Sequence, residues 1–418
     1  MNLQRLFFLE AAHSQHVQQP DIPLSEVIRQ WQPFYSTGKE TTFHTLQSLQ
    51  WRASSIVYAT PSEPTMAWKE GSNHSTLIYK GKEISVSRLQ DCVGAIEDAA
   101  AGLLQHKLLF SHHFPINITA LQDDMGNTEP GFSLFNYRPN VEVFGFQDAL
   151  ALHIMTTPHL CQEFIVESSE DNVLWNPLSL SRWLHNYAQL DLLCLVQVEM
   201  NCGAPGRTTE LTAMSTINTF LGVPRAPRLF DGHFVLMRTY TKTRSTTGVD
   251  RLIPHSLNAS LAAFMIYKEA ICRPFAQLCA SILFPDNSKA HTLYQDTLFV
   301  NYGQMFVAAD ITSEMQRWTL DHFGLPIGIR DWRQVSTPLR RHWAGLQEDW
   351  VEDEQTADSA QAGHSHVMDR MHYGVTTRSA FGLAEDYIGP YLTVSKRWQR
   401  LLHLVPGRRD FSNLHSHC

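Results

Sequence analysis

The sequence lacks several features that would place it in a class at once. It has no apolar run of about 18 residues or more, which argues against a membrane-spanning helix. Its opening, MNLQRLFFLEAAHSQHV, has only a short apolar patch broken by Glu10 and makes a poor secretory signal. No P-loop pattern occurs, so we do not expect the chain by itself to be an ATPase.

Cysteine and metal patterns are equally sparse. The seven cysteines are scattered and form no C-x-x-C pair, which favours reduced thiols in an intracellular compartment over a disulfide framework. His415, His417 and Cys418 do not have the spacing of a four-ligand zinc site, and we expect a frayed tail there. We therefore predict no metal and no cofactor.

Charge is unevenly distributed along the chain. The formal net charge is −8, which at first argues against a nucleic-acid partner. Residues 1–200 carry 11 Lys/Arg and 21 Asp/Glu (net −10), and residues 201–418 carry the remaining 22 and 20 (net +2). Six of the acids in the second half lie between Glu348 and Asp358, so the rest of that half is modestly basic. If the chain binds an anionic ligand, we expect it to do so in this half.

Apolar periodicity predicts several helices. Residues 85–110 form an amphipathic pattern whose apolar stripe contains Leu89, Cys92, Val93, Ile96 and Ala99. Further helices are predicted over 178–203, 259–284, 313–323, 330–346 and 392–404. The last of these is amphipathic. The first 75 residues and residues 111–178 have no pattern that orders them.

A small antiparallel sheet is predicted between two of these helices. RLFDGHFVLMRTYTK contains the tight-turn pair Asp231-Gly232 between two β-like runs, the second of which reaches Lys242. The turn TRSTTG follows, and VDRLIP is a short third strand that we expect to end at Pro254. The fold class is therefore mainly α with a small three-stranded antiparallel sheet (α+β), without the βαβ alternation of a doubly wound fold.

Basic residues recur at ordered positions on these elements. Arg207 in GAPGRTTEL precedes Glu210 by one helical turn, and Lys242 ends a hairpin strand. Arg330 and Arg333 in RDWRQ share one helix face. Each of these features taken singly is more often a surface ion pair or a solvated charge. GHSHVMDRMHYG then places His364 nine residues before Tyr373.

In this order, the set resembles the catalytic pattern of the tyrosine recombinase (integrase) family, and more distantly that of type IB topoisomerases. The resemblance covers about residues 180–375. GAPGRTTEL, TKTRSTTGVDRLIP, GIRDWRQV and GHSHVMDRMHYG are most similar to recombinase-like proteins of fungi, whose relatives occur in Crypton-type mobile elements and beside RecQ-type helicases. Arg330 stands where the family most often has a histidine, and Gln334 where a second histidine often follows.

The resemblance implies a site-specific DNA recombinase that cuts and rejoins DNA through a 3′-phosphotyrosyl intermediate. Arg207 and Arg333 would clamp the non-bridging oxygens, with Arg330 as a further phosphate ligand. Lys242 would act as general acid, His364 as a hydrogen-bond donor and Tyr373 as nucleophile. The remaining implied residues are Glu210, which would orient its neighbours, and the DNA contacts Arg244 and Arg251.

The resemblance also implies an architecture and partners. A helical core-binding lobe over 79–177 would precede a catalytic domain over 178–405, after an N-terminal region (1–78) of unclear fold and before a tail (406–418). Double-stranded DNA would be the partner, a tetramer the assembly and the nucleus the location. In such a tetramer the helix at 392–404 would either be exchanged between subunits or pack on its own domain. Two alternatives stay open: a domesticated, catalytically silent DNA-binding module associated with a RecQ-type helicase, and a helical protein without a DNA role.

Overall fold

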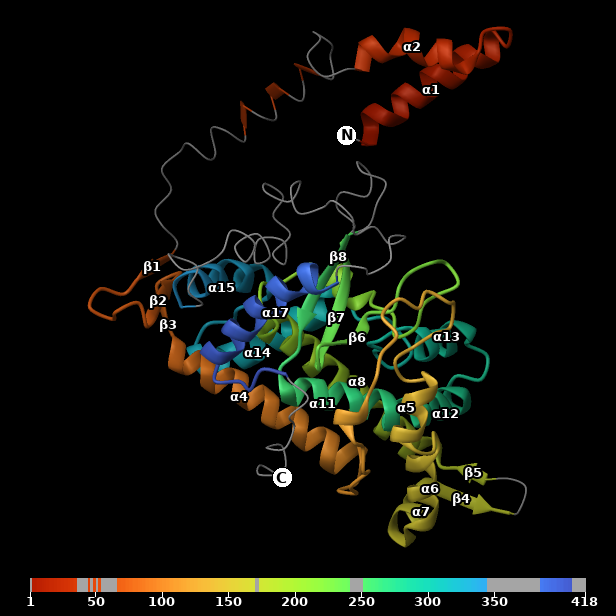
Figure 1. Ribbon diagram of the computed structural model, residues 1–418, viewed down its shortest axis with the longest axis vertical. Helices are drawn as coiled ribbons and strands as arrows, with labels where there is room; N and C mark the ends of the chain where they lie inside the picture. Colours follow the sequence, from red (N-terminus) through yellow and green to blue (C-terminus); the bar gives the residue numbers. More distant parts are fainter. Residues whose placement is uncertain are drawn as a thin grey trace. The chain divides into compact units, whose positions relative to one another are not determined.

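The structure is a computed structural model, which describes residues 2–35, 44–45, 48–49, 52–53, 66–169, 173–240, 251–343 and 384–407 (Figure 1). The chain divides into two compact units, residues 1–65 and residues 66–418, and each is considered by itself. The domain boundaries predicted after residues 78, 177 and 405 stay predictions.

The first unit contains two helices that the sequence pattern did not predict. These helices, α1 (Asn2–Gln18) and α2 (Leu24–Tyr35), pack against each other and bury Ala12 and Val27. A hydrogen bond from Gln15 Nε2 to Gln30 Oε1 (2.9 Å) links the pair. The apolar positions of these helices are separated by glutamine, histidine and serine, which hid the helical period.

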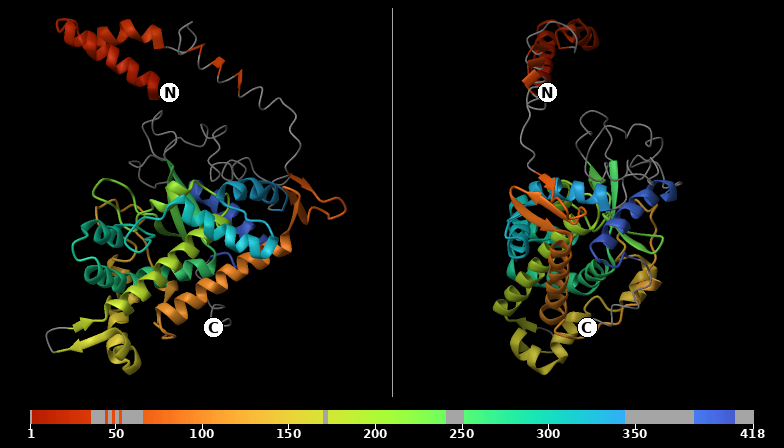
Figure 2. Two further views of the ribbon diagram at one scale, coloured as in Figure 1. Left: turned by 180° about the vertical axis from the view of Figure 1, so that it is seen from behind. Right: turned by 90° about the vertical axis from the view of Figure 1, so that its left-hand side faces the viewer.

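The second unit is built around one long helix, α8 (Pro177–Asn201), which confirms the helix predicted over 178–203. Asn176 begins it by accepting a hydrogen bond from the Leu178 backbone N–H (3.1 Å). Most of α8 is buried because other helices cover it on several sides (Figures 1 and 2). The covering helices are α4 (Val86–Gly102), α7 (Pro158–Phe164), α12 (Arg273–Leu283) and α14 (Ala308–Phe323).

The helix predicted over 85–110 is also confirmed. Ser85 caps α4 by accepting from the Arg88 N–H (3.2 Å), and the predicted stripe from Leu89 to Ile96 is buried. After Gly102 the helix continues as a π-helical turn, η1 (Leu103–Leu108). Because α4 packs on α8 and α14, segments on both sides of the predicted boundary after residue 177 share one hydrophobic core.

The predicted three-stranded sheet is present as β6 (Pro227–Phe230), β7 (His233–Tyr240) and β8 (Arg251–Ser256), all antiparallel. Asp231 and Gly232 both have positive φ (45° and 72°), as a two-residue hairpin turn requires. One detail of the prediction is wrong, since β8 does not end at Pro254. It continues to Ser256 with Pro254 opposite Met237, which an edge strand tolerates because one side of its backbone needs no ladder donors.

Two further small sheets lie in the first half of the chain. In one of them β1 (Met66–Trp68), β2 (Thr76–Tyr79) and β3 (Lys82–Ser85) are antiparallel, and β2 contacts α15 (Ile329–Trp343). The other sheet is an antiparallel pair of strands, β4 (Ile165–Ser168) and β5 (Val173–Trp175). Short elements thus occupy the region that the sequence did not order: η2 (Ile118–Ala120), α5 (Arg138–Phe144), α6 (Ala149–Thr156), α7, β4 and β5.

The remaining helices follow the prediction closely. The helix expected over 259–284 is present as α11 (Ala259–Tyr267), a π-helical turn η3 (Lys268–Cys272) and α12. The helix α14 includes the range predicted at 313–323, and α15 covers 330–343 of the helix predicted at 330–346, whose last three residues lie outside the described residues. The short helix α9 (Thr208–Thr212) contains the helical turn expected between Arg207 and Glu210, and α13 (Ser288–Asp296) was not predicted. The coarse fold class, a mainly helical chain with small antiparallel sheets, is confirmed.

The helix predicted near 392–404 is α17 (Ala384–Leu401), which begins earlier than expected. It packs on β8 and α8 of its own chain. The buried Trp398 donates its indole N–H to the Met200 carbonyl (2.7 Å), and Ser395 Oγ donates to the Cys202 carbonyl (2.8 Å). Of the two possibilities left open for this helix, the structure shows packing on its own domain.

No helix in the described ranges is both long and apolar enough to cross a membrane. The six cysteines in those ranges form no disulfide.

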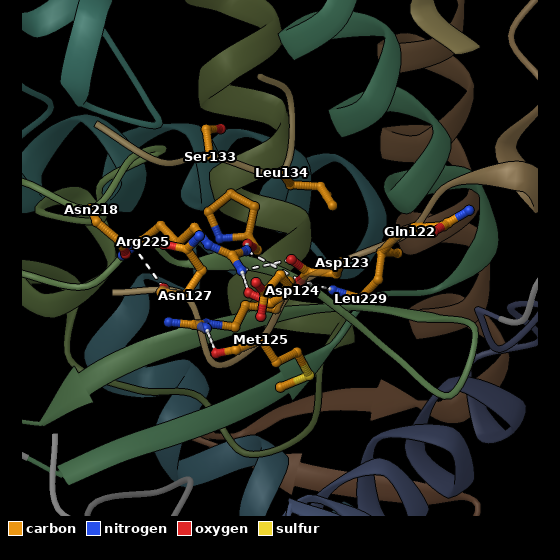
Figure 3. A network of polar contacts seen from close by, with 12 residues as sticks. Gln122, Asp123, Asp124, Met125, Asn127, Ser133, Leu134, Asn218, Arg225 and Leu229 are labelled. Atoms are coloured by element: carbon orange, nitrogen blue, oxygen red, sulfur yellow. Dashed lines mark hydrogen bonds and ion pairs between the residues drawn. The ribbon is translucent and has the colours of Figure 1, made fainter. Parts of the chain in front are cut away.

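A buried ion pair fastens an extended segment to the β6–β7–β8 sheet (Figure 3). Arg225 and Asp123 are fully buried, and two hydrogen bonds join their side chains (2.6 and 3.2 Å). Asp123 also accepts from the Leu229 N–H (2.8 Å), and Arg225 donates to the carbonyls of Pro227 and Asp124. These contacts satisfy both charges inside the fold.

A second buried cluster lies where η3 meets α8. Lys268 Nζ is 2.5 Å from Asp191 Oδ1 and 2.9 Å from Glu269 Oε1, and Arg273 pairs with Glu269 (2.6 Å). Asp191 also accepts from the Val300 N–H (2.8 Å). Two cations therefore meet two anions, so the cluster is electrically balanced.

Candidate functional site: an arginine-lined cavity

A cavity of about 1230 Å³ opens beside α15 in the second unit. Its walls come from β1 and the β1–β2 turn, from the residues that start α9, from α14 and from one face of α15. Cationic and polar side chains of the wall include Arg207, Thr208, Arg330, Arg333, Gln334, Thr337, Arg341 and His342. This volume lies above the usual range for small-molecule sites, which is roughly 300–1,000 Å³.

The helix α15 presents its cations on one face. Arg330, Arg333, Thr337 and Arg341 recur every three or four residues, and all of them line the cavity. This confirms the prediction that Arg330 and Arg333 share a helix face. The opposite face points into the core, where the buried Trp332 donates its indole N–H to the Glu199 carbonyl of α8 (3.2 Å).

The small β1–β2–β3 sheet holds the first turn of α15 in place. Asp331 accepts a hydrogen bond from the Tyr79 hydroxyl (2.7 Å) and pairs with Lys80 Nζ (3.0 Å). Burial alone would raise the pKa of Asp331, but the hydrogen bonds from Tyr79 and Lys80 hold it below its ordinary value. Asp331 therefore stays ionised, and its contacts with Tyr79 and Lys80 tie α15 to the small sheet.

Arg207 reaches the same cavity from a different part of the chain. It occupies the position that begins α9, and its side chain is 32% exposed, whereas that of Glu210 is 3% exposed. Glu210 lies behind it, 3.9 Å from Arg207 Nη1 and 3.3 Å from Nε of the buried Arg238. A carboxylate shared by two guanidiniums orients both of them. The supporting role expected for Glu210 in the reaction stays a prediction.

Arg238 and Gly206 complete this arrangement and were not predicted. A Cβ added at Gly206 would lie 0.9 Å from Arg238 Nη1, so the backbone before Arg207 passes directly over the buried guanidinium. Only glycine permits this approach without displacing Arg238. The signal in the sequence was weak, because Arg238 sits inside an otherwise apolar strand that reads as an ordinary sheet segment.

The charges around the cavity are coupled. Burial raises the pKa of the Glu199 carboxyl from its ordinary 4.5 to about 7, although Arg238 and Arg333 act to lower it. Burial likewise lowers the pKa of Arg238, the nearby carboxylates of Glu210 and Glu199 oppose that shift, and the positive charges of Arg333 and Arg207 add to it. Arg207, Arg238 and Arg333 thus form one mutually repelling positive group.

Cations exceed anions at this site. Six arginines lie on the wall or directly behind it, whereas Glu199, Glu210 and Asp331 are the carboxylates that these contacts and pKa shifts identify within the described ranges. Guanidiniums bind phosphate oxygens through paired hydrogen bonds. The arrangement can therefore hold a phosphate group, and its size leaves room for the rest of a nucleotide chain. The six are Arg207, Arg238, Arg330, Arg333, Arg340 and Arg341.

The other predicted site residues are not placed by the structure. Lys242, Arg244, His364 and Tyr373 lie outside the described residues. Arg251 is the first residue of β8, opposite Tyr240, and its side chain is not described. The structure thus brings together Arg207, Glu210, Arg330 and Arg333, and the remaining positions stay predictions.

Three further residues of the cavity wall, Arg341, Trp68 and His74, were not predicted from the sequence. Arg341 continues the period set by Arg330 and Arg333 and could have been found by extending that count by two more turns. Trp68 and His74 come from the first 75 residues, where no period was visible, and pack against His342 at the far end of α15.

Comparisons with known proteins add no assignment to this geometry. No protein-family model matches the chain, and no solved structure matches it.

Proposed function

We propose that the chain is a tyrosine-type DNA strand transferase, a site-specific recombinase or integrase of the kind that mobile elements carry, and that it works at the arginine-lined cavity. One observation carries the proposal. Arg207, which begins α9, and Arg330 and Arg333, which lie on α15, line the same cavity although the chain separates them widely. The resemblance to the recombinase pattern requires this meeting of distant residues.

The proposed reaction is a transesterification. The Tyr373 oxygen attacks the DNA phosphorus, the bond from phosphorus to the 5′ oxygen breaks, and Lys242 gives that oxygen a proton. The phenol proton passes to solvent. The 3′ phosphate then stays esterified to Tyr373, and the reverse attack by a 5′ hydroxyl reseals the strand without ATP. Arg207 and Arg333 stabilise the added charge on the non-bridging oxygens, with His364 as a further donor.

The excess of cations supports an anionic substrate. Mutually repelling guanidiniums held together by the fold lose part of that repulsion when a phosphate lies between them. Because Arg330 is a poor proton acceptor at neutral pH, its role in this scheme is to bind phosphate. Glu210 positions Arg207 through the shared contact with Arg238.

The wider recombinase architecture belongs to the same proposal. The partner would be double-stranded DNA in the nucleus, contacted also by Arg244 and Arg251. Catalysis would take place in a tetramer on two duplexes. The proposal does not require exchange of α17, since that helix packs on its own chain.

Covalent capture tests the proposal. The purified protein is incubated at low ionic strength with a pool of nicked duplexes of randomised sequence, in which a cleaved short fragment diffuses away and traps the intermediate. A denaturing gel then measures the protein–DNA adduct. Tyr373→Phe should abolish the adduct, and Arg333→Ala should lower its rate of formation by roughly 10²–10³. Both variants should still bind DNA.

Arg182→Ala is the matched control, because Arg182 is an exposed arginine of α8 that pairs with Glu163 away from the cavity. It should leave adduct formation unchanged. An adduct formed equally by Tyr373→Phe would remove Tyr373 from the mechanism. DNA binding by the parent protein without any adduct would favour the DNA-binding module instead, and no binding at low salt would remove both functions.

A further inference from the structure

The cavity has an aromatic wall that the proposed chemistry does not use. Trp68 of β1, His74 of the β1–β2 turn and His342 of α15 all line it. The ring centroids of His74 and His342 are 4.0 Å apart at an interplanar angle of 27°, and Trp68 lies 5.3 Å from His74 and 5.5 Å from His342. Two rings of the β1–β2 hairpin and one ring of α15 thus form one cluster at the cavity wall.

The rings are partly open to solvent. Trp68 and His342 are half-buried and His74 is exposed, so the cluster is not simply part of the core. Burial and the neighbouring His74 lower the pKa of His342, which keeps that imidazole neutral at pH 7. A partly exposed ring surface inside a cationic cavity is suited to stack on a flat group.

The turn that carries His74 has an unusual backbone. Asn73 and His74 both have positive φ (48° and 60°), which two consecutive side-chain-bearing residues rarely adopt. Hydrogen bonds from Ser72 Oγ to the Lys69 carbonyl (2.6 Å) and from Ser75 Oγ to the Ser72 carbonyl (2.7 Å) hold the turn. The turn thus holds His74 at the cavity wall.

The aromatic wall and the arginines are fixed to one framework. His342 directly follows Arg341, which lines the same cavity, and α15 carries the cations from Arg330 to Arg341 over about 16 Å. The β1–β2–β3 sheet that supplies Trp68 and His74 is joined to α15 by the Tyr79 and Lys80 contacts with Asp331. A ligand that touches both surfaces therefore meets groups that are already in place.

We propose that Trp68, His74 and His342 form a nucleobase subsite, which stacks an unpaired base of the DNA strand whose phosphates the cavity arginines hold. This inference rests on the proposed function, because it takes DNA as the ligand. A base within a duplex has both faces covered by its neighbours, so the subsite takes a base that has left the stack at or beside the broken strand.

Two DNA probes test the subsite. One is a duplex with a one-nucleotide gap and an unpaired 2-aminopurine opposite it, and the other is the same duplex fully paired. Affinity is measured by fluorescence anisotropy and stacking by 2-aminopurine emission. Trp68→Ala and His74→Ala should weaken binding of the gapped probe by roughly 5- to 150-fold, the usual worth of one stacked base, and abolish quenching. Binding of the paired probe should change by less than about twofold.

His185→Ala is the matched control, because the His185 ring also stacks on an aromatic ring, that of Tyr302 (3.9 Å), but lies outside the cavity. It should leave both affinities unchanged. Trp68→Phe keeps an aromatic ring and should retain most of the discrimination, which guards against a loss caused by misfolding of the alanine variant. Circular dichroism of each variant confirms its fold.

The outcomes separate the subsite from the proposed function. The subsite is refuted if the parent forms the covalent adduct while Trp68→Ala and His74→Ala keep the parent's ratio of affinities for the gapped and paired probes. The cluster would then only pack β1 against α15. If the parent binds neither probe at low salt, the proposed function fails and the subsite falls with it. Selective loss on the gapped probe supports the subsite.

Discussion

Basic residues gather in two regions of the second unit, and the two groups differ in how their charges are balanced. Around Asp191 and Glu269 two anions meet Lys268 and Arg273 at 2.5–2.9 Å, with no charge left over. Around the cavity, arginines outnumber the carboxylates described above, and several of these arginines line the open wall. The first arrangement completes its interactions within the fold, whereas the second presents guanidiniums to an open cavity.

This difference is visible in geometry and not in composition. Arg225 and Arg333 are both arginines near carboxylates, but Arg225 is fully buried and its donors are directed at Asp123 and at backbone carbonyls. Arg333 is half-buried, lines the cavity and acts electrostatically on Glu199 and Arg238. Substitutions in the two regions should therefore affect different properties: stability in one, and anion binding in the other.

The largest effect is expected from breaking the balanced cluster. Lys268→Met removes one cation and leaves Asp191 buried with an uncompensated charge, which should lower the free energy of unfolding by about 3–5 kcal/mol. Urea denaturation measures this change. Lys289→Met, at an exposed position of α13, is the control and should change stability by less than about 0.5 kcal/mol. Equal effects of the two substitutions would mean that the cluster contributes nothing.

A pH-dependent effect should follow from Glu199 behind the cavity. Its pKa rises on folding from the ordinary 4.5 to about 7, so the folded state binds the extra proton. The stability that depends on protonated Glu199 is fully present below about pH 4.5 and is lost as the pH rises through about 7. The free energy of unfolding should fall by up to roughly 3 kcal/mol over this range.

Glu199→Gln removes this titration. The stability of the variant relative to the parent should rise between pH 5 and pH 8, as measured by urea denaturation across that range. Parallel pH profiles for the two proteins would show that Glu199 does not gain a proton on folding.

Gly206→Ala tests the close approach that links Arg207 to Arg238. The added methyl group must displace the buried guanidinium from Glu210, which should cost about 1–3 kcal/mol and misplace Arg207. Gly94→Ala in α4, where an added Cβ meets nothing within 4 Å, should instead stabilise the protein by about 0.5–1 kcal/mol. Thermal denaturation distinguishes the two signs, and a stabilising Gly206→Ala would contradict the packing described for Arg238.

The smallest change is expected from Arg341→Ala. An exposed arginine with no part in the core should alter stability by less than about 0.5 kcal/mol. If it contacts phosphate, its loss should reduce the slope of log affinity for DNA against log salt by about 1. Arg182→Ala should leave that slope unchanged. An unaltered slope for Arg341→Ala would take this residue out of the DNA contact.

Local features of the fold could be read from the sequence. The period of α4, the apolar length of α8 and the Asp231-Gly232 turn each depend on residues a few positions apart, and each was predicted correctly. The shared face of Arg330 and Arg333 is local in the same sense. Where polar residues interrupt the pattern, as in α1, α2 and the elements between residues 111 and 178, the period was lost and the helices were missed.

Long-range features of the site required more than periodicity. The meeting of Arg207 with α15 depends on tertiary packing, in which Trp332 anchors α15 to α8, and only the ordered family pattern suggested it. Arg238 was missed because a charged residue in an apolar strand gives no sign of the carboxylates it will meet. Trp68 and His74 were missed because they meet His342, far away in the sequence, only in the folded chain.

The contact of Tyr79 and Lys80 with Asp331 has a consequence for the residue next to it. Asp331 directly follows Arg330, and the two charges act on each other electrostatically. The small sheet at residues 66–85 places Lys80 beside Asp331, and the positive charge of Lys80 offsets part of the negative charge that Asp331 sets next to Arg330. A shortened chain starting at α4 would keep every arginine of the wall and yet present a weaker positive field.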